Sequence, residues 1–148
     1  MASASFLLDT NVVSELARPA PAPPVVSWVA AQAPLALHLS ALTFGEIEAG
    51  VARMAGGARR DALARWARTE LPRQFAGRVL AVDVAVALAW GRVVAAGRDA
   101  GRTAPMVDAL LVATAVTHGL TLVTRNVADC AGRGAPVFDP WTGTLHRA

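Results

Sequence analysis

Three acidic residues of this chain occupy positions where a carboxylate is unusual. Asp9 directly follows the apolar stretch FLL, Asp108 lies in the almost wholly apolar segment 106–116, and Glu46 lies in a segment with helical periodicity. A buried carboxylate is costly unless it has a partner. If the three acids met at separations of about 5 Å, each pair would repel by roughly 3 kcal/mol, and the site would take up a proton or a metal ion. Oxygen ligands of this kind suit Mg²⁺ or Mn²⁺ rather than zinc.

Each acid also has a simpler explanation. Asp9 could cap a helix, and Asp108 could interact with the dipole at the N-terminus of its own helix. Glu46 shares a helix face with Thr43 and Gly50, whereas Glu48 points away from that face and is expected to be solvated. The residues taken one at a time leave these alternatives open.

The segments that must position the acids alternate between strand and helix. Strands are predicted at 5–9, 35–39, 78–82, 120–124 and 135–138, and helices at 11–18, 25–33, 41–55, 58–71, 83–101 and 105–119. This alternation predicts an α/β sandwich with a mainly parallel sheet, formed by a single domain that spans residues 1–148. Sites in such sheets form at the carboxyl ends of the strands, so Asp9 and the TRN segment at 124–126 are expected at one rim. Ser40 is placed to cap the helix that follows it.

The commonest α/β functions require residues that this sequence lacks. A phosphate-binding P-loop needs a Lys, of which the chain has none, and the turn after the first strand, DTNVVSE, is not the glycine-rich turn of a dinucleotide-binding domain. The sequence contains neither GxSxG nor HExxH. The three His residues are too widely spaced to suggest a metal site, and Cys130 is expected to be a small buried residue. The four Trp residues are expected to anchor the core or an interface rather than to stack on bases.

The charge of the chain is carried by arginine. All 14 basic residues are Arg, the net charge is +3, and seven of these Arg residues lie between positions 53 and 78 against two acids. A solvated helix face and a surface for nucleic acid or an acidic partner explain this cluster equally well. The most apolar segment, 79–97, is interrupted by Asp83 and Arg92, which argues against a membrane span. With one cysteine and no export signal at the N-terminus, a cytoplasmic protein is expected.

Four stretches of the sequence, taken in order, resemble one known family. LLDTN, LSALTFGEIEAG, MVDALLVATAVTHGLTLVTRN and VFDPW are similar to the PIN-domain ribonucleases, specifically to VapC-type toxins of bacterial toxin–antitoxin pairs. The likeness covers nearly the whole chain. It implies a three-layer α/β/α fold, cleavage of RNA that depends on Mg²⁺ or Mn²⁺, and a small separate antitoxin protein as partner.

The resemblance also implies roles for individual residues. By position, Asp9, Glu46 and Asp108 correspond to three acidic residues of the family, and Thr10 and Ser40 fit its supporting polar positions. We predict that Asp9 and Asp108 hold the metal ion. Glu46 is predicted to orient the attacking water or another ligand of the ion.

The fourth position of the site departs from the family's pattern. The family often has an Asp after TR, whereas this chain has Asn126. An amide oxygen can ligate Mg²⁺ but brings no charge, and Asp129, three residues further on, is the alternative ligand. This departure bears on metal affinity more than on the fold, and either Asn126 or Asp129 is predicted to complete the site.

A second class of function remains compatible with the sequence. The chain could be a catalytically weak PIN-fold module that binds RNA or a protein partner without cleaving RNA. A receiver domain also has acids after its first strand, but it needs a lysine that this chain lacks. The Trp-bearing segments 23–33 and 58–72 are candidate surfaces for a homodimer or for the antitoxin.

Overall fold

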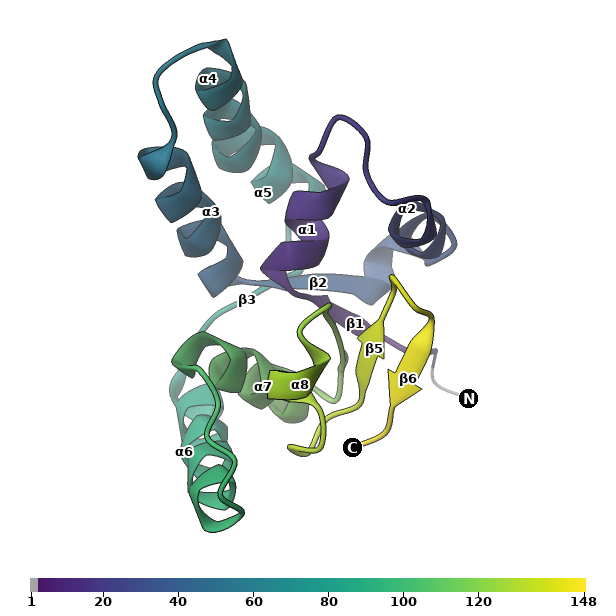
Figure 1. Cartoon of the computed structure of the whole chain (residues 1–148), viewed down its shortest axis with the longest axis vertical. Helices are drawn as coiled ribbons and strands as arrows, with labels where there is room; N and C mark the ends of the chain where they lie inside the picture. Colours follow the sequence, from purple (N-terminus) through teal and green to yellow (C-terminus); the bar gives the residue numbers. More distant parts are fainter. Residues whose placement is uncertain (1–2) are drawn as a thin grey trace.

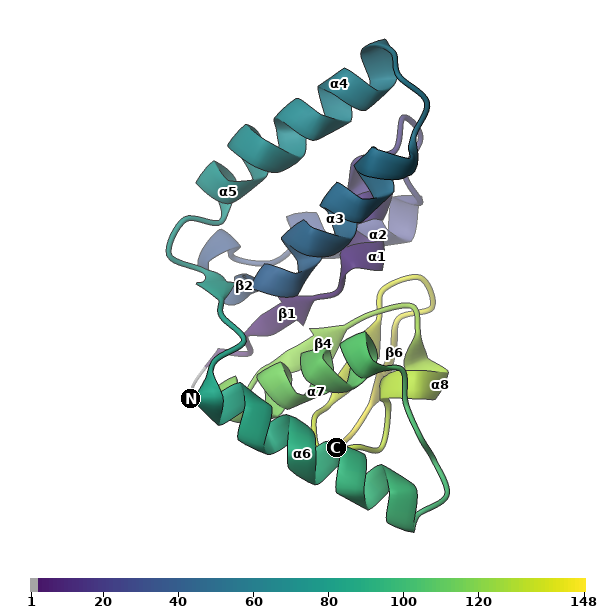
Figure 2. The same ribbon diagram turned by 90° about the vertical axis from the view of Figure 1, so that its left-hand side faces the viewer.

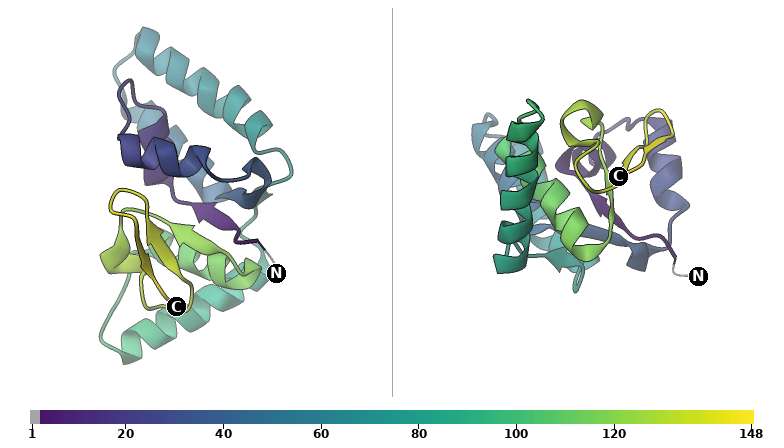
Figure 3. Two further views of the ribbon diagram at one scale, coloured as in Figure 1. Left: turned by 90° about the vertical axis from the view of Figure 1, so that its right-hand side faces the viewer. Right: turned by 90° about the horizontal axis from the view of Figure 1, so that it is seen from below.

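The central sheet confirms the predicted α/β class. A computed structural model of the chain describes residues 3–148, and within that range one sheet has the strand order β3-β2-β1-β4-β5-β6. Its strands are β1 (Phe6–Leu8), β2 (Leu37–Ser40), β3 (Val79–Leu80), β4 (Thr121–Val123), β5 (Val137–Asp139) and β6 (Thr144–His146). All neighbouring pairs are parallel except β5 and β6, which form an antiparallel hairpin at the edge of the sheet (Figure 3).

Helices cover both faces of this sheet, as the three-layer expectation requires. They are α1 (Thr10–Leu16), α2 (Pro23–Ala30), α3 (Ala41–Arg53), α4 (Ala58–Arg65), α5 (Leu71–Gln74), α6 (Val84–Asp99), α7 (Met106–His118) and α8 (Val127–Cys130). Helices α1 to α5 lie on one side of the sheet, and α6 and α7 lie on the other (Figures 1 and 2). No helix among residues 3–148 is both long and apolar enough to cross a membrane.

The two layers have separate cores because neighbouring residues of a strand point to opposite faces. Leu8 and Val123 pack with the core beneath α1 to α5, whereas Leu7 and Leu122 pack with the core beneath α6 and α7. All four side chains are fully buried, and each contributes about 1.5–3 kcal/mol to stability. This packing fixes the register of β1 and β4, and with it the position of the residues that directly follow them.

The strand predictions were accurate for β1, β4 and β5 and less so for the other strands. Pro34–Ala36 form a 3₁₀ turn, so β2 begins at Leu37 instead of residue 35. Strand β3 has two residues, and neither α8 nor β6 was predicted. Elements of two to four residues, such as β3, α8 and β6, are too short to show a hydrophobic periodicity, so a sequence pattern does not reveal them.

The predicted helix at 58–71 is continuous but changes type. A π-helical stretch, Trp66–Glu70, joins α4 to α5. The buried side chains Ala67, Leu71 and Phe75 are spaced four residues apart, as neighbours on one face of a helix are.

Helix α7 is buried because α6 covers it from outside. Every residue from Ala109 to Ala115 is buried, and Ala89 and Val86 of α6 pack against Ala113. Alanine at these positions lets the two helices approach closely. Pro105 caps the start of α7, although it was expected within its first turn. The site residue Asp108 is therefore carried by one of the most rigidly held elements of the fold.

The end of α6 provides a test of this packing. Replacing Gly97 with Ala would place the new Cβ 2.6 Å from the backbone oxygen of Arg102. We expect Gly97→Ala to lower the free energy of unfolding by about 2 kcal/mol, measured by urea denaturation. The matched control is Gly91→Ala in the same helix, where the new Cβ meets nothing within 4 Å. This control should raise stability by about 0.5–1 kcal/mol, and equal effects of the two substitutions would contradict the packing described here.

Candidate active site

Asp9 lies at the carboxyl end of β1 and serves both as a helix cap and as part of a polar cluster. Its Oδ1 accepts a hydrogen bond of 2.6 Å from the backbone N–H of Thr10, at the N-terminus of α1. Its Oδ2 accepts a bond of 2.7 Å from the hydroxyl of Thr124, which follows β4. The side chain of Asp9 is only 6% exposed. The helix-cap explanation is therefore correct but incomplete, because this carboxylate also joins two strands.

Glu46 approaches the same rim from α3. The hydroxyl of Thr10 donates to Oε1 of Glu46 at 2.6 Å and lies 3.1 Å from the hydroxyl of Thr43. Thr43 and Glu46 share a helix face, as predicted, and Thr10 connects that face to Asp9. Glu48 points elsewhere and forms an ion pair with Arg68 on the outer surface.

Asp108 reaches the cluster through Asn126. The side-chain amide of Asn126 donates to Oδ2 of Asp108 at 2.9 Å, and its backbone N–H donates to the Thr124 hydroxyl at 2.9 Å. Because Thr124 also binds Asp9, a continuous hydrogen-bonded path joins three acids that lie up to 99 positions apart in the sequence. These residues form what is called here the acid cluster: Asp9, Thr10, Glu46, Asp108, Thr124 and Asn126.

The remaining two predicted residues lie beside this cluster. Ser40 is fully buried, and its hydroxyl accepts a bond from the N–H of Leu42, so it caps α3 as expected. Asp129 lies in α8, where its negative charge acts on Asp108. The structure thus brings Asp129 close to the acids, while Ser40 acts through the position of α3.

Two contributing residues were missed by the sequence analysis. Thr124 binds Asp9, and the Asn11 side chain donates to Thr124 at 3.1 Å and accepts from the N–H of Arg125 at 3.3 Å. Asn11 and Thr124 lie in the polar stretches DTN and TRN that follow two predicted strands. Both side chains are uncharged, so neither was proposed as a ligand. Position after a parallel strand places both residues at the rim, but it does not reveal which side chains they bind.

Burial and mutual repulsion destabilise the charged forms of the acids. Burial raises the pKa of Asp9 from its ordinary value of 3.8 to about 6, and the charges of Glu46 and Asp108 act in the same direction. Burial also raises the pKa of Asp108, as do the charges of Asp129 and Glu46, whereas Arg133 opposes this shift. The hydrogen bonds through Thr124 and Asn126 place the two aspartates at the same rim of the sheet.

The donor atoms of this cluster fit a hard divalent cation. Within residues 3–148, no three His, Cys, Asp or Glu side chains are gathered tightly enough to hold one metal ion. The side chains at the rim nevertheless offer only oxygen for ligation, and the hydrogen bonds described above use one oxygen of Glu46 and one of Asp108. A cation would neutralise the charges that raise the pKa values here, and Mg²⁺ and Mn²⁺ prefer such oxygen donors.

The pKa of Asp9 predicts how stability depends on pH when metal is absent. Because the folded state holds this proton more tightly than the unfolded state, the contribution of Asp9 falls as pH rises from about 4 through about 6. We expect the stability difference between the parent chain and Asp9→Asn to change by about 2.5 kcal/mol between pH 4 and pH 7.5. Urea denaturation in EDTA at both pH values measures this difference, and a difference independent of pH would contradict the assignment.

A match to a known protein family identifies the fold that carries the acid cluster. The PIN domain family model matches residues 6–128, which include every member of the acid cluster. The chain belongs to the PIN-domain family. This match confirms the resemblance inferred from the four sequence stretches.

Three PIN-domain relatives and one solved structure are similar over nearly the whole chain. Plasmid stability protein StbB of Pseudomonas syringae pv. tomato is 38% identical, and VapC ribonuclease Y4jK of Sinorhizobium fredii and toxin FitB of Neisseria gonorrhoeae are each 34% identical. Each alignment covers 92% of this chain and 97% or 98% of the relative. The crystal structure of FitAcB from Neisseria gonorrhoeae matches with a TM-score of 0.87 at 34% identity, over 92% of this chain and 98% of that one.

Proposed function

We propose that this PIN-domain protein is a metal-dependent endoribonuclease and the toxin of a toxin–antitoxin pair. The observation that carries the proposal is the hydrogen-bonded acid cluster, which brings Asp9, Glu46 and Asp108 to one rim of the sheet. Such a cluster is suited to bind a divalent cation. The ribonuclease and toxin names of the relatives support RNA as the substrate and an antitoxin as the inhibitor.

The proposed roles follow from the surroundings of each side chain. Asp9 and Asp108 would hold the cation, and either Asn126 or Asp129 would complete its ligands. When bound, a divalent cation lowers the pKa of a water and polarises the phosphoryl oxygen for in-line attack. Glu46 would orient that water through the carboxylate oxygen that does not bind Thr10. The Thr10 hydroxyl would hold the carboxylate of Glu46 in place, and the Thr124 hydroxyl would hold that of Asp9.

Metal removal tests the proposal directly. The purified protein is expected to cleave a pool of RNA oligonucleotides in Mg²⁺ or Mn²⁺, to stop in excess EDTA, and to recover when Mn²⁺ is added back. The loss should be complete, because neutral water is a poor nucleophile without the cation. Full cleavage in excess EDTA would disprove the proposal. RNA binding without cleavage would instead favour the alternative function, a catalytically weak module that binds RNA. Asn126 supports this alternative, because it brings no charge to the metal ion.

Cys130 does not offer a competing nucleophile. Its side chain is fully buried, and burial together with the charges of Asp108, Asp9 and Asp129 raises the pKa of the thiol to about 12. A thiol of this kind stays protonated and unreactive at neutral pH. The chemistry of the site therefore rests on carboxylates.

A further inference from the structure

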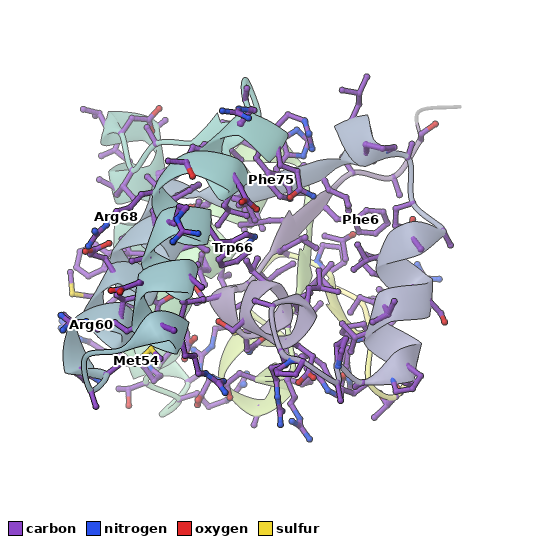
Figure 4. The ribbon with its side chains drawn as sticks, turned by 90° about the horizontal axis from the view of Figure 1, so that it is seen from above. Phe6, Met54, Arg60, Trp66, Arg68 and Phe75 are labelled. Carbon is purple, nitrogen blue, oxygen red and sulfur yellow. The ribbon has the colours of Figure 1, made fainter. Side chains whose placement is uncertain are left out.

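A groove extends from the acid cluster along the layer of α1, α3 and α4. It has a volume of about 530 Å³, within the range that accommodates a small-molecule ligand. Thr10 and Glu46 line it at the acid cluster, and Trp66, Arg125 and Trp141 are among its other walls. Figure 4 looks down on this layer, with Trp66 between α4 and α1, while Arg60 and Arg68 point outward. The groove is thus continuous with the site of the proposed chemistry.

One wall of the groove is a stacked pair of side chains. The guanidinium of Arg125 lies over the ring of Trp141, 5.0 Å from the ring centroid. Trp141 is half-buried. Its backbone N–H donates to Oδ1 of Asp139 at 2.8 Å, and this bond fixes the turn that carries the ring. Arg125 is exposed, and its backbone is tied to Asn11 next to the acid cluster. The pair therefore presents a flat cationic layer to solvent at a fixed place beside the acids.

The charges along the groove favour an anionic ligand. Arg18 is already paired with the buried Glu15, whose other oxygen accepts the N–H of Ala22. Among residues 3–148, Arg59 and Arg125 form no salt bridge, and both line the groove. A bound divalent cation would leave the three carboxylates of the acid cluster with a net charge of −1, and the two guanidinium groups would then make the groove and the cluster together net positive. Guanidinium forks bind phosphate oxygens in pairs of hydrogen bonds.

We propose that this groove binds the RNA nucleotide next to the cut, with its base stacked on the layer formed by Arg125 and Trp141. Arginine planes and aromatic rings are the surfaces on which proteins stack unpaired bases. A base paired within a duplex has no free face, so only an unpaired base can stack on this layer. Trp141 packs against the core beneath α1 to α5, as its sequence context predicts, and the proposal gives its ring a second role. The inference rests on the proposed ribonuclease function and names the two side chains that position the base of its substrate.

The kinetics of cleavage test the stacking layer. The probes are a pool of unstructured RNA oligonucleotides and a fully paired duplex of matched composition, both in Mn²⁺. Arg125→Gln and Trp141→Leu are expected to raise KM for the unstructured pool about tenfold while kcat changes little. Cleavage of the duplex, which cannot stack a base here, should stay low and unaffected by either change. Trp141→Phe keeps an aromatic face and should fall between the parent chain and Trp141→Leu.

Two controls separate stacking from other effects. Arg73→Gln removes the same charge from the exposed surface of α5 and should leave KM within twofold of the parent chain. Arg125 is exposed, so its variant tests the layer even if Trp141→Leu fails to fold. If the parent chain cleaves RNA but Arg125→Gln and Trp141→Phe leave KM unchanged, the inference is wrong and the groove is left as a surface for protein. If the parent chain cleaves no RNA in any metal, the proposed function itself fails.

Discussion

The Asp108→Asn variant is expected to fold like the parent chain and to lose RNA cleavage by about 10³-fold. Loss of one carboxylate ligand removes several kcal/mol of transition-state stabilisation by the cation, which corresponds to this factor. Asp108 suits the test better than Asp9, because the Asp9 carboxylate also caps α1 and binds Thr124. An amide at position 108 keeps the shape of the side chain and an oxygen that can accept from Asn126. The measurement is the initial rate of oligonucleotide cleavage at saturating Mn²⁺.

The control for this variant is Asp99→Asn. Asp99 is exposed at the end of α6, so the same chemical change is made away from the acid cluster. Its cleavage rate should equal that of the parent chain, and both variants should melt within a few degrees of it. Undiminished cleavage by a folded Asp108→Asn variant would show that the acid cluster is not the catalytic site.

The Asn126→Asp variant is expected to bind Mn²⁺ roughly tenfold more tightly and to be less stable without it. In the parent chain the Asn126 amide donates to Asp108, and a carboxylate there would exchange that bond for repulsion between two negative charges. The repulsion raises the pKa of the pair and destabilises the metal-free fold by about 1–3 kcal/mol. With the cation bound, the added charge becomes favourable, because ligand charge sets divalent-ion affinity.

Calorimetric titration with Mn²⁺ and thermal melting in EDTA measure the two effects separately. Gln74→Glu is the matched control, since it turns an exposed amide into an acid on α5, outside the acid cluster. It should change neither quantity appreciably. Unchanged Mn²⁺ affinity of Asn126→Asp would place Asn126 outside the metal's ligands and leave Asp129 to complete them.

The sequence by itself indicated which acids would meet and determined the class of the fold. Asp9 stands out because it ends an apolar strand, and Asp108 because a buried helix rarely carries a carboxylate. The alternation of strands and helices predicted the parallel sheet, which places the residues after β1 and β4 at one rim. These inferences succeed because periodicity and burial are local properties that a single chain displays.

Only the tertiary structure decided how these residues connect. The bonds from Thr124 to Asp9, from Thr10 to Glu46 and from Asn126 to Asp108 depend on how strands and helices pair. Arg125 and Trp141 form a layer for the same reason, since sequence spacing does not reveal that two loops meet. Hydrogen-bond geometry needs positions good to a few tenths of an ångström, which packing of the whole molecule sets and residue pattern cannot.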